Sequence, residues 1–167
     1  MQFSASAEQK QRAQTPHNLF ISGSFFSHLL LAPAAIVLDI GMAGLLLPLL
    51  CTLLLTGGIY LRSRRRGDWF VDSHWRLSWA RCRVLLYGYA FSGALIVLAW
   101  LLSLNASDVH MGHIFWTALT RVALVPTLII VMVTAVLEFS AYAQAGKGEV
   151  PDTLAARYPP PAGLPRP

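Results

Sequence analysis

From Leu19 to Leu61 the chain runs for 43 residues with a single formal charge, Asp39. One helix of that length would reach about 64 Å at 1.5 Å per residue, roughly twice the hydrocarbon thickness of a bilayer. The segment therefore has to fold back, and the Asp39-Ile40-Gly41 step supplies a natural turn. This predicts two membrane spans, at about residues 19–38 and 40–61.

Two further apolar segments follow, at about residues 84–104 and 114–139. Hydrophobic residues make up 55% of the 167-residue chain and charged residues only 13%, too few to cover the core of a soluble domain. We therefore expect an all-α integral membrane bundle with four transmembrane helices. The alternative has three spans, with residues 19–38 lying on the membrane because Pro33 and several small polar residues interrupt them.

Polar tails flank this membrane domain. Residues 1–18 carry no signal-peptide pattern and predict an N-terminal tail. Residues 140–167 lose the apolar pattern and end in a proline-rich sequence, which predicts a disordered C-terminal tail.

The basic residues gather between the second and third spans. Residues 62–83 contain seven arginines, whereas the loop between the third and fourth spans contains no lysine or arginine. By the positive-inside rule, this predicts that residues 62–83 and both termini are cytoplasmic. If residues 73–83 are helical, they form an amphipathic juxtamembrane helix. We expect anionic lipid headgroups as partners, and no nucleic acid, at Arg62, Arg64, Arg65, Arg66, Trp69, Trp75, Arg76, Trp79 and Arg83.

Charged residues inside a bilayer are costly, so each one needs a partner or a function. Arg121 lies seven residues into the fourth span, and an ion pair with Asp39 or an outward path toward Asp108 would satisfy it. Glu138 lies at the inner end of the same span, at the depth expected for Arg62, Arg81 and Arg83. A structural pairing and a substrate or ion path are both consistent with these positions.

Three histidines are candidates for a haem or a metal: His28 in the first span, and His110 and His113 near the outer face. A haem in a membrane needs two histidines at similar depth, and a closed zinc site needs four ligands, which this pattern does not supply. Cys51 and Cys82 are expected at different depths, which argues against a disulfide. The sequence therefore predicts no cofactor, and it shows no catalytic constellation.

The order of features resembles a known family. A span containing Gly44 and Pro48 precedes a basic stretch, then the segment Trp69–His74 (WFVDSH), then two more spans. This resembles small bacterial four-helix membrane proteins that are related to a chloroplast inner-envelope translocon component. The resemblance implies four helices, with His74 at the start of a helix. The chain departs from that pattern at residues 75–79, where WRLSW replaces a run of asparagine and glutamine.

These features predict a non-enzymatic, multi-pass protein of the bacterial inner membrane. An accessory or assembly subunit, which packs against other membrane proteins or against itself, is the favoured hypothesis. One alternative is a small oligomeric transporter or channel that uses Arg121, Asp39 and His28. The other is a redox subunit that binds haem through His28 and an outer histidine.

Overall fold

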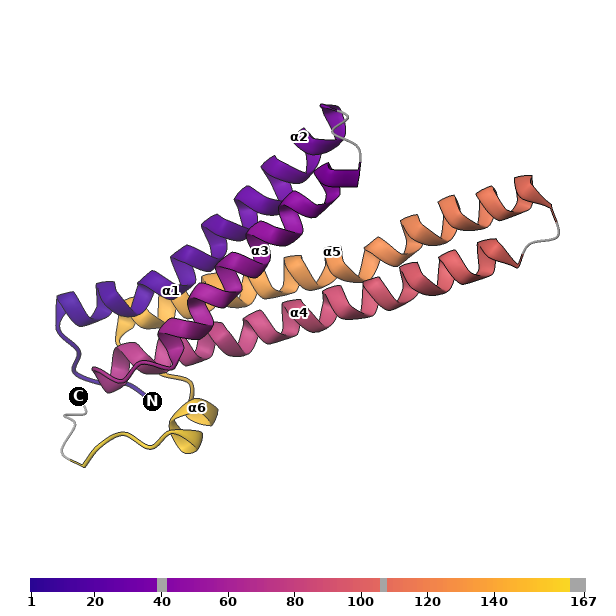
Figure 1. The fold of residues 1–167 in the computed structure, drawn as a ribbon. Helices are drawn as coiled ribbons and strands as arrows, with labels where there is room; N and C mark the ends of the chain where they lie inside the picture. The colour runs from indigo at the N-terminus through magenta and orange to yellow at the C-terminus, as the bar shows by residue number, and fades with distance from the viewer. Residues whose placement is uncertain (39–41, 106–107, 163–167) are drawn as a thin grey trace. The chain divides into compact units, whose positions relative to one another are not determined.

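The computed structural model describes residues 1–38, 42–105 and 108–162. The described residues form helices and no strand, so the expected all-helical fold is confirmed for them. The elements in chain order are α1 (Ala7–Phe25), η1 (Phe26–Leu31, a π-helical segment), α2 (Ala32–Val37), α3 (Met42–Ser63), α4 (Trp69–Leu104), α5 (Val109–Lys147) and α6 (Asp152–Arg157) (Figure 1).

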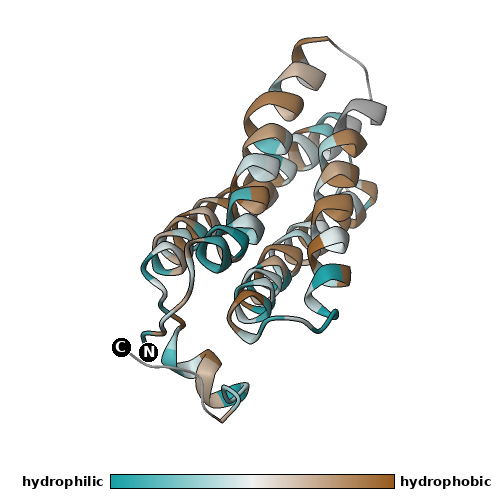
Figure 2. Cartoon of the chain, turned by 90° about the vertical axis from the view of Figure 1, so that its left-hand side faces the viewer, coloured by the Kyte–Doolittle hydropathy of each residue, from teal (hydrophilic) through white to brown (hydrophobic). Residues whose placement is uncertain are grey.

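Four helical segments are long and apolar enough to cross a membrane, as the sequence predicts: Ala7–Ala35, Leu46–Ser63, Trp69–Leu104 and His110–Lys147. The chain itself covers little of their surface, since only 17–22% of the residues in their most apolar windows are buried. Hydrophobic residues recur along the long helices in Figure 2, and hydrophilic ones gather near the chain termini. Most of this apolar surface therefore needs a covering that the chain does not provide.

The first helix begins twelve residues before the expected Leu19, at Ala7. The reason is a capping box: the Ser6 hydroxyl accepts from the Gln9 backbone N–H at 3.2 Å, and the Gln9 side chain accepts from the Ser6 N–H at 2.8 Å. These two bonds satisfy donors that a helix start leaves unpaired. The residues expected to form a polar tail therefore form the first turns of α1.

The first helix does not break at Pro33, where an interruption is expected. Instead it widens into the π-helical segment η1, in which the Ala32 N–H donates to the Ser27 carbonyl, five residues back. Proline has no N–H and clashes with the carbonyl four residues before it, and a π-bulge is one way for a helix to accommodate this.

The helices that contain the third and fourth predicted spans, α4 and α5, are longer than those spans. Asp68 begins α4 by accepting from the N–H groups of Phe70 and Val71 at 2.9 and 3.2 Å, so the juxtamembrane segment and the third span form one helix. Gly148, with φ of 81°, ends α5 in the left-handed conformation, and there a Cβ would lie 2.7 Å from the Phe3 carbonyl. Glycine is the residue that adopts this conformation at low cost.

The two tails fold together, in contrast to the expected disorder of residues 140–167, of which the structure describes 140–162. Phe3, Phe70, Val150 and Ala155 are buried in one small apolar cluster. The Phe3 N–H also donates to the Gly148 carbonyl at 2.9 Å. Neither tail contains an apolar run long enough to predict a core, but together with the start of α4 they bury one. We call this cluster, with Ala13 and Ala145, the terminal cluster.

The chain divides into two compact units, one of Met1–Arg81 with Ala135–Pro167 and one of Cys82–Thr134. In the first, Gly23 allows a close approach of α1 and α3, since a Cβ there would lie 2.6 Å from the Leu55 side chain. Small residues at such positions are typical of helices that pack closely in membranes.

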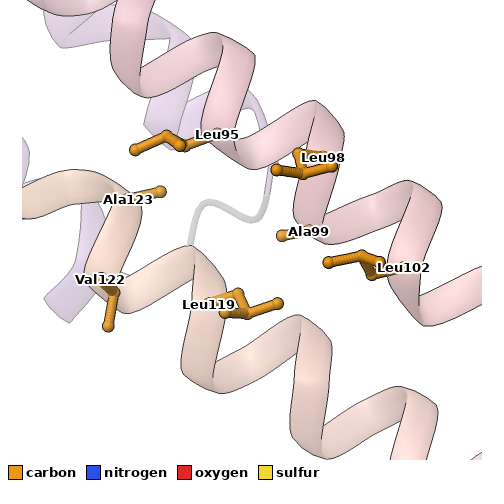
Figure 3. Close-up of a pocket in the computed structure, with 7 residues that line it drawn as sticks. All are labelled: Leu95, Leu98, Ala99, Leu102, Leu119, Val122 and Ala123. Carbon is orange, nitrogen blue, oxygen red and sulfur yellow. The ribbon is translucent and has the colours of Figure 1, made fainter.

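The second unit is a hairpin made of the adjoining parts of α4 and α5. A hydrogen bond of 2.7 Å joins the hydroxyls of Ser92 and Thr127, both buried. Nearer the end of the hairpin, Ala99 and Ala123 line a shallow apolar recess of about 100 Å³ (Figure 3). The recess has no polar side chain to orient a ligand, so we assign it no binding role.

A substitution at Gly88 tests how closely the two helices of this hairpin pack. A Cβ at Gly88 would lie 2.7 Å from Cδ1 and 3.2 Å from Cβ of Ile130, whereas a Cβ at Gly93 would meet nothing within 4 Å. We expect Gly88→Ala to lower the free energy of unfolding by about 1–3 kcal/mol, the usual cost of overpacking. Gly93→Ala is the matched control on the same helix and should cause no loss. Reversible unfolding in mixed detergent micelles measures both, and equal effects would contradict the close packing.

Candidate functional site

Three ionisable side chains from three helices meet in the interior of the first unit. His17 of α1, His74 of α4 and Glu138 of α5 are each 0% exposed. His17 Nδ1 contacts Glu138 Oε2, and His17 Nε2 lies 2.9 Å from His74 Nδ1. His74 Nε2 in turn lies 3.1 Å from the backbone carbonyl of Glu149. We call these three side chains the His–His–Glu cluster.

The carbonyl at the end of this row restricts where the protons lie. A carbonyl oxygen only accepts, so His74 Nε2 carries a proton and donates to Glu149. In a neutral His74 ring, Nδ1 is then an acceptor, and His17 Nε2 donates to it. His17 Nδ1, the other nitrogen of that ring, then faces Glu138 without a proton of its own. A hydrogen bond at that contact needs one further proton, held by His17 or by Glu138.

Arg81 is the nearest cation to this carboxyl group. Its guanidinium donates to the Leu137 carbonyl at 2.5 Å and lies 3.8 Å from Glu138 Oε2. The other carboxyl oxygen, Oε1, is buried and has no hydrogen-bond partner among the described residues. Glu138 thus has a histidine and an arginine as neighbours, together with a vacant acceptor.

Neighbouring side chains and the turn at the end of α5 hold the three side chains of the His–His–Glu cluster in place. Pro16 and Phe20, beside His17 on α1, are buried, and the Ser78 hydroxyl of α4 donates to the Pro16 carbonyl at 3.5 Å. Phe70, from the terminal cluster, packs edge-on against His74 with ring centroids 5.0 Å apart. Gly148 turns the chain at the end of α5 and so directs the next carbonyl, that of Glu149, toward His74.

The sequence grouped Glu138 with Arg62, Arg81 and Arg83, of which Arg81 lies 3.8 Å from Glu138 Oε2, but it did not identify the two histidines as site residues. His17 fell in a segment interpreted as a polar tail, and His74 was noted only as a helix-start position. One signal was available: Ser6 and Gln9 have capping-box spacing, which extends the helix back to Ala7. The buried residues then recur on one helical face at Ala13, His17, Phe20, Ser24 and Ser27.

The other polar candidates that the structure describes do not join the cluster. Asp39 lies outside the described residues, so its expected ion pair with Arg121 is not described. Arg121 is exposed on α5 and makes no hydrogen bond or ion pair with a described residue. His28 Nδ1 lies 2.9 Å from the Ser24 carbonyl of its own helix. His110 and His113 are exposed.

Several residues expected at the lipid headgroups make contacts within the chain. The Arg62 guanidinium lies 3.3 Å from Asp72 and 5.3 Å from the ring centre of Trp75. The Trp69 indole N–H donates to the Tyr158 carbonyl at 3.1 Å. Arg76 lies over the Tyr158 ring, and Trp79 and Arg64 both contact the Tyr60 ring. Of the other arginines in this set, Arg83 is half-buried and the two exposed ones are Arg65 and Arg66.

The described residues contain no group of three or more side chains arranged to hold a metal ion. In the His–His–Glu cluster, both ring nitrogens of His17 are already directed at protein partners, and His74 directs both of its own in the same way. The arrangement is that of a hydrogen-bonded row, which is suited to holding and moving a proton.

Comparison of the chain with protein-family models, with curated proteins and with solved structures finds no match.

Proposed function

We propose that this chain is a multi-pass protein of the bacterial inner membrane that acts as an accessory subunit of a membrane complex. The four long helices with their uncovered apolar surface support the membrane location. The arginines of residues 62–83 support a cytoplasmic position for that segment and for both termini. The relation to the small bacterial four-helix family is part of this proposal and rests on sequence features.

One observation carries the subunit role: Arg121 is exposed on the hairpin without a described partner. It lies twelve residues beyond the start of α5, or about 18 Å along the helix axis. A cation in apolar surroundings is stable only when it pairs with another group or reaches the interface. A carboxylate on a neighbouring membrane protein would provide such a pair.

The surface around Arg121 has the form of a helix-docking stripe. Exposed residues recur at heptad-like spacing on one face of α5, at Ile114, Ala118, Arg121, Val125, Leu128 and Met132. Apolar residues at such spacing pack against a partner helix, and a single polar residue among them fixes the choice of partner and the register. The partner we infer is therefore an apolar helix with an acidic residue opposite Arg121.

The orientation is tested by labelling single cysteines in intact cells. In a background in which Cys51 and Cys82 are replaced by serine, Arg65→Cys reports on the basic loop and Asp108→Cys reports on the loop between α4 and α5. We expect a membrane-impermeant maleimide to label only Asp108→Cys until the cells are permeabilised. Labelling of Arg65→Cys in intact cells would refute the cytoplasmic placement of that loop.

The subunit role is tested by substituting Arg121. We expect Arg121→Leu to reduce recovery of the partner from native membranes by about tenfold or more, because loss of one member of a buried charge pair costs on the order of 2–5 kcal/mol. Arg121→Lys keeps the charge and should retain most of the partner. The isolated Arg121→Leu chain should be at least as stable as the wild type, since the substitution removes a charge that pairs with no described residue.

Two results would contradict the subunit role. One is a wild-type protein that is recovered without any partner. The other is an Arg121→Leu protein that retains its partner but unfolds more easily, because that outcome assigns Arg121 a structural role within the chain.

A further inference from the structure

We propose that His17, His74 and Glu138 form a proton-binding site that takes up one exchangeable proton, and that His17 bridges Glu138 of α5 and His74 of α4 only while that proton is bound. The ligand is a single proton, and the site lies within the first unit, whereas the Arg121 stripe belongs to the second. The inference goes beyond the proposed subunit role and does not depend on it.

The first step of the argument is the count of protons. When both rings are neutral, each carries one N–H, and His74 uses its own at Nε2 to donate to the Glu149 carbonyl. If Glu138 were also an unprotonated carboxylate, the single N–H of His17 could serve either Glu138 or His74, and two acceptors would face each other at the other contact. Two acceptors repel at hydrogen-bond distance. The two observed contacts of His17 together therefore require one proton more than this state holds.

The second step is where that proton can reside. It can lie on Glu138, which then donates O–H to His17 Nδ1. Breaking that O–H bond and forming an N–H bond at Nδ1 gives a His17 imidazolium beside a carboxylate. If His17 then breaks its Nε2–H bond and His74 forms a bond at Nδ1, the charge has moved to His74. All three states hold the same number of protons, and none requires a side chain to rotate.

The third step is what happens when the proton leaves. The single N–H of a neutral His17 can then serve only one of its two contacts, so one link of the row loses its hydrogen bond, and Arg81, 3.8 Å from Oε2, remains beside the carboxylate. His17 therefore bridges Glu138 and His74 only while the proton is present. Arg81 already donates to the Leu137 carbonyl, so it stays next to Glu138 in both states.

The charged groups of the packed elements agree with this assignment. His17 is the ionisable group that α1 contributes, α4 contributes His74 and Arg81, and α5 contributes Glu138. Arg62 of α3 is paired with Asp72 of α4 and does not compete for the cluster. The Glu149 side chain is separate from the row, which uses only its backbone carbonyl, and it lines a recess of about 170 Å³ with Gln144 and Asp152.

Histidine ¹⁵N NMR of the full chain in liposomes tests the site directly. The chain has five histidines, so substituting asparagine at His28, His110 and His113 leaves only His17 and His74. At a pH where the site holds its exchangeable proton, we expect the three side chains to carry three protons in total. Two neutral rings beside a carboxylate would carry only two, and we expect the additional proton at the His17–Glu138 contact. We expect His74 to be protonated at Nε2. As the pH rises, the pair should release one proton, and the helices should become less stable.

Two variants complete the test. Glu138→Gln keeps a donor toward His17 Nδ1 but holds no exchangeable proton, so we expect both rings to be neutral throughout and the number of released protons to fall by one. Glu149→Gln is the matched control, and it should leave the count unchanged because only the carbonyl takes part. The wild-type spectra test the proposal even if Glu138→Gln fails to fold. A wild-type spectrum with His17 unprotonated at Nδ1 beside an ionised Glu138 would overturn it, as would two histidines that titrate independently of Glu138.

Discussion

The contact between His17 and Glu138 is the interaction on which the first unit depends. It joins α1 to the end of α5, two segments separated by 121 residues, and it does so between side chains that are fully buried. A buried carboxylate without a partner would cost several kcal/mol, so its surroundings have to supply a proton or a cation. His17 and Arg81 are the two groups that do so, and His74 extends the row to the backbone at Glu149.

The two tails of the chain pack against the same residues and support this arrangement. Val150 and Ala155 pack with Phe3 and Phe70, and Phe70 lies against the His74 ring. Gly148 reverses the chain after α5, and the carbonyl that follows receives the proton of His74 Nε2. A segment that composition alone presents as a disordered, proline-rich tail therefore contributes the last acceptor of the row. The Glu149 carbonyl, next to Val150 of the terminal cluster, determines that His74 carries a proton at Nε2.

The long helices could be predicted from the sequence because hydrophobic length is a local property. Of the predicted runs, residues 42–61, 84–104 and 114–139 each lie within a helix of the structure. The start of α1 was missed because the apolar run begins after the helix does, at a capping box. The pairing of His17 with Glu138 depends on tertiary contacts between distant segments, for which the spacing of residues gives no signal.

A double-mutant cycle between His17 and Glu138 tests the central claim most directly. Either His17→Leu or Glu138→Leu alone leaves a buried polar partner unsatisfied, whereas the double substitution removes both groups. We expect the double variant to be no less stable than either single variant, with a coupling energy of about 1–3 kcal/mol in the free energy of unfolding. The exposed pair Glu8 and Arg12 on α1 is the control and should couple by about 0.2–0.5 kcal/mol. Additive losses at His17 and Glu138 would contradict the account, because the two side chains would then contribute to stability independently.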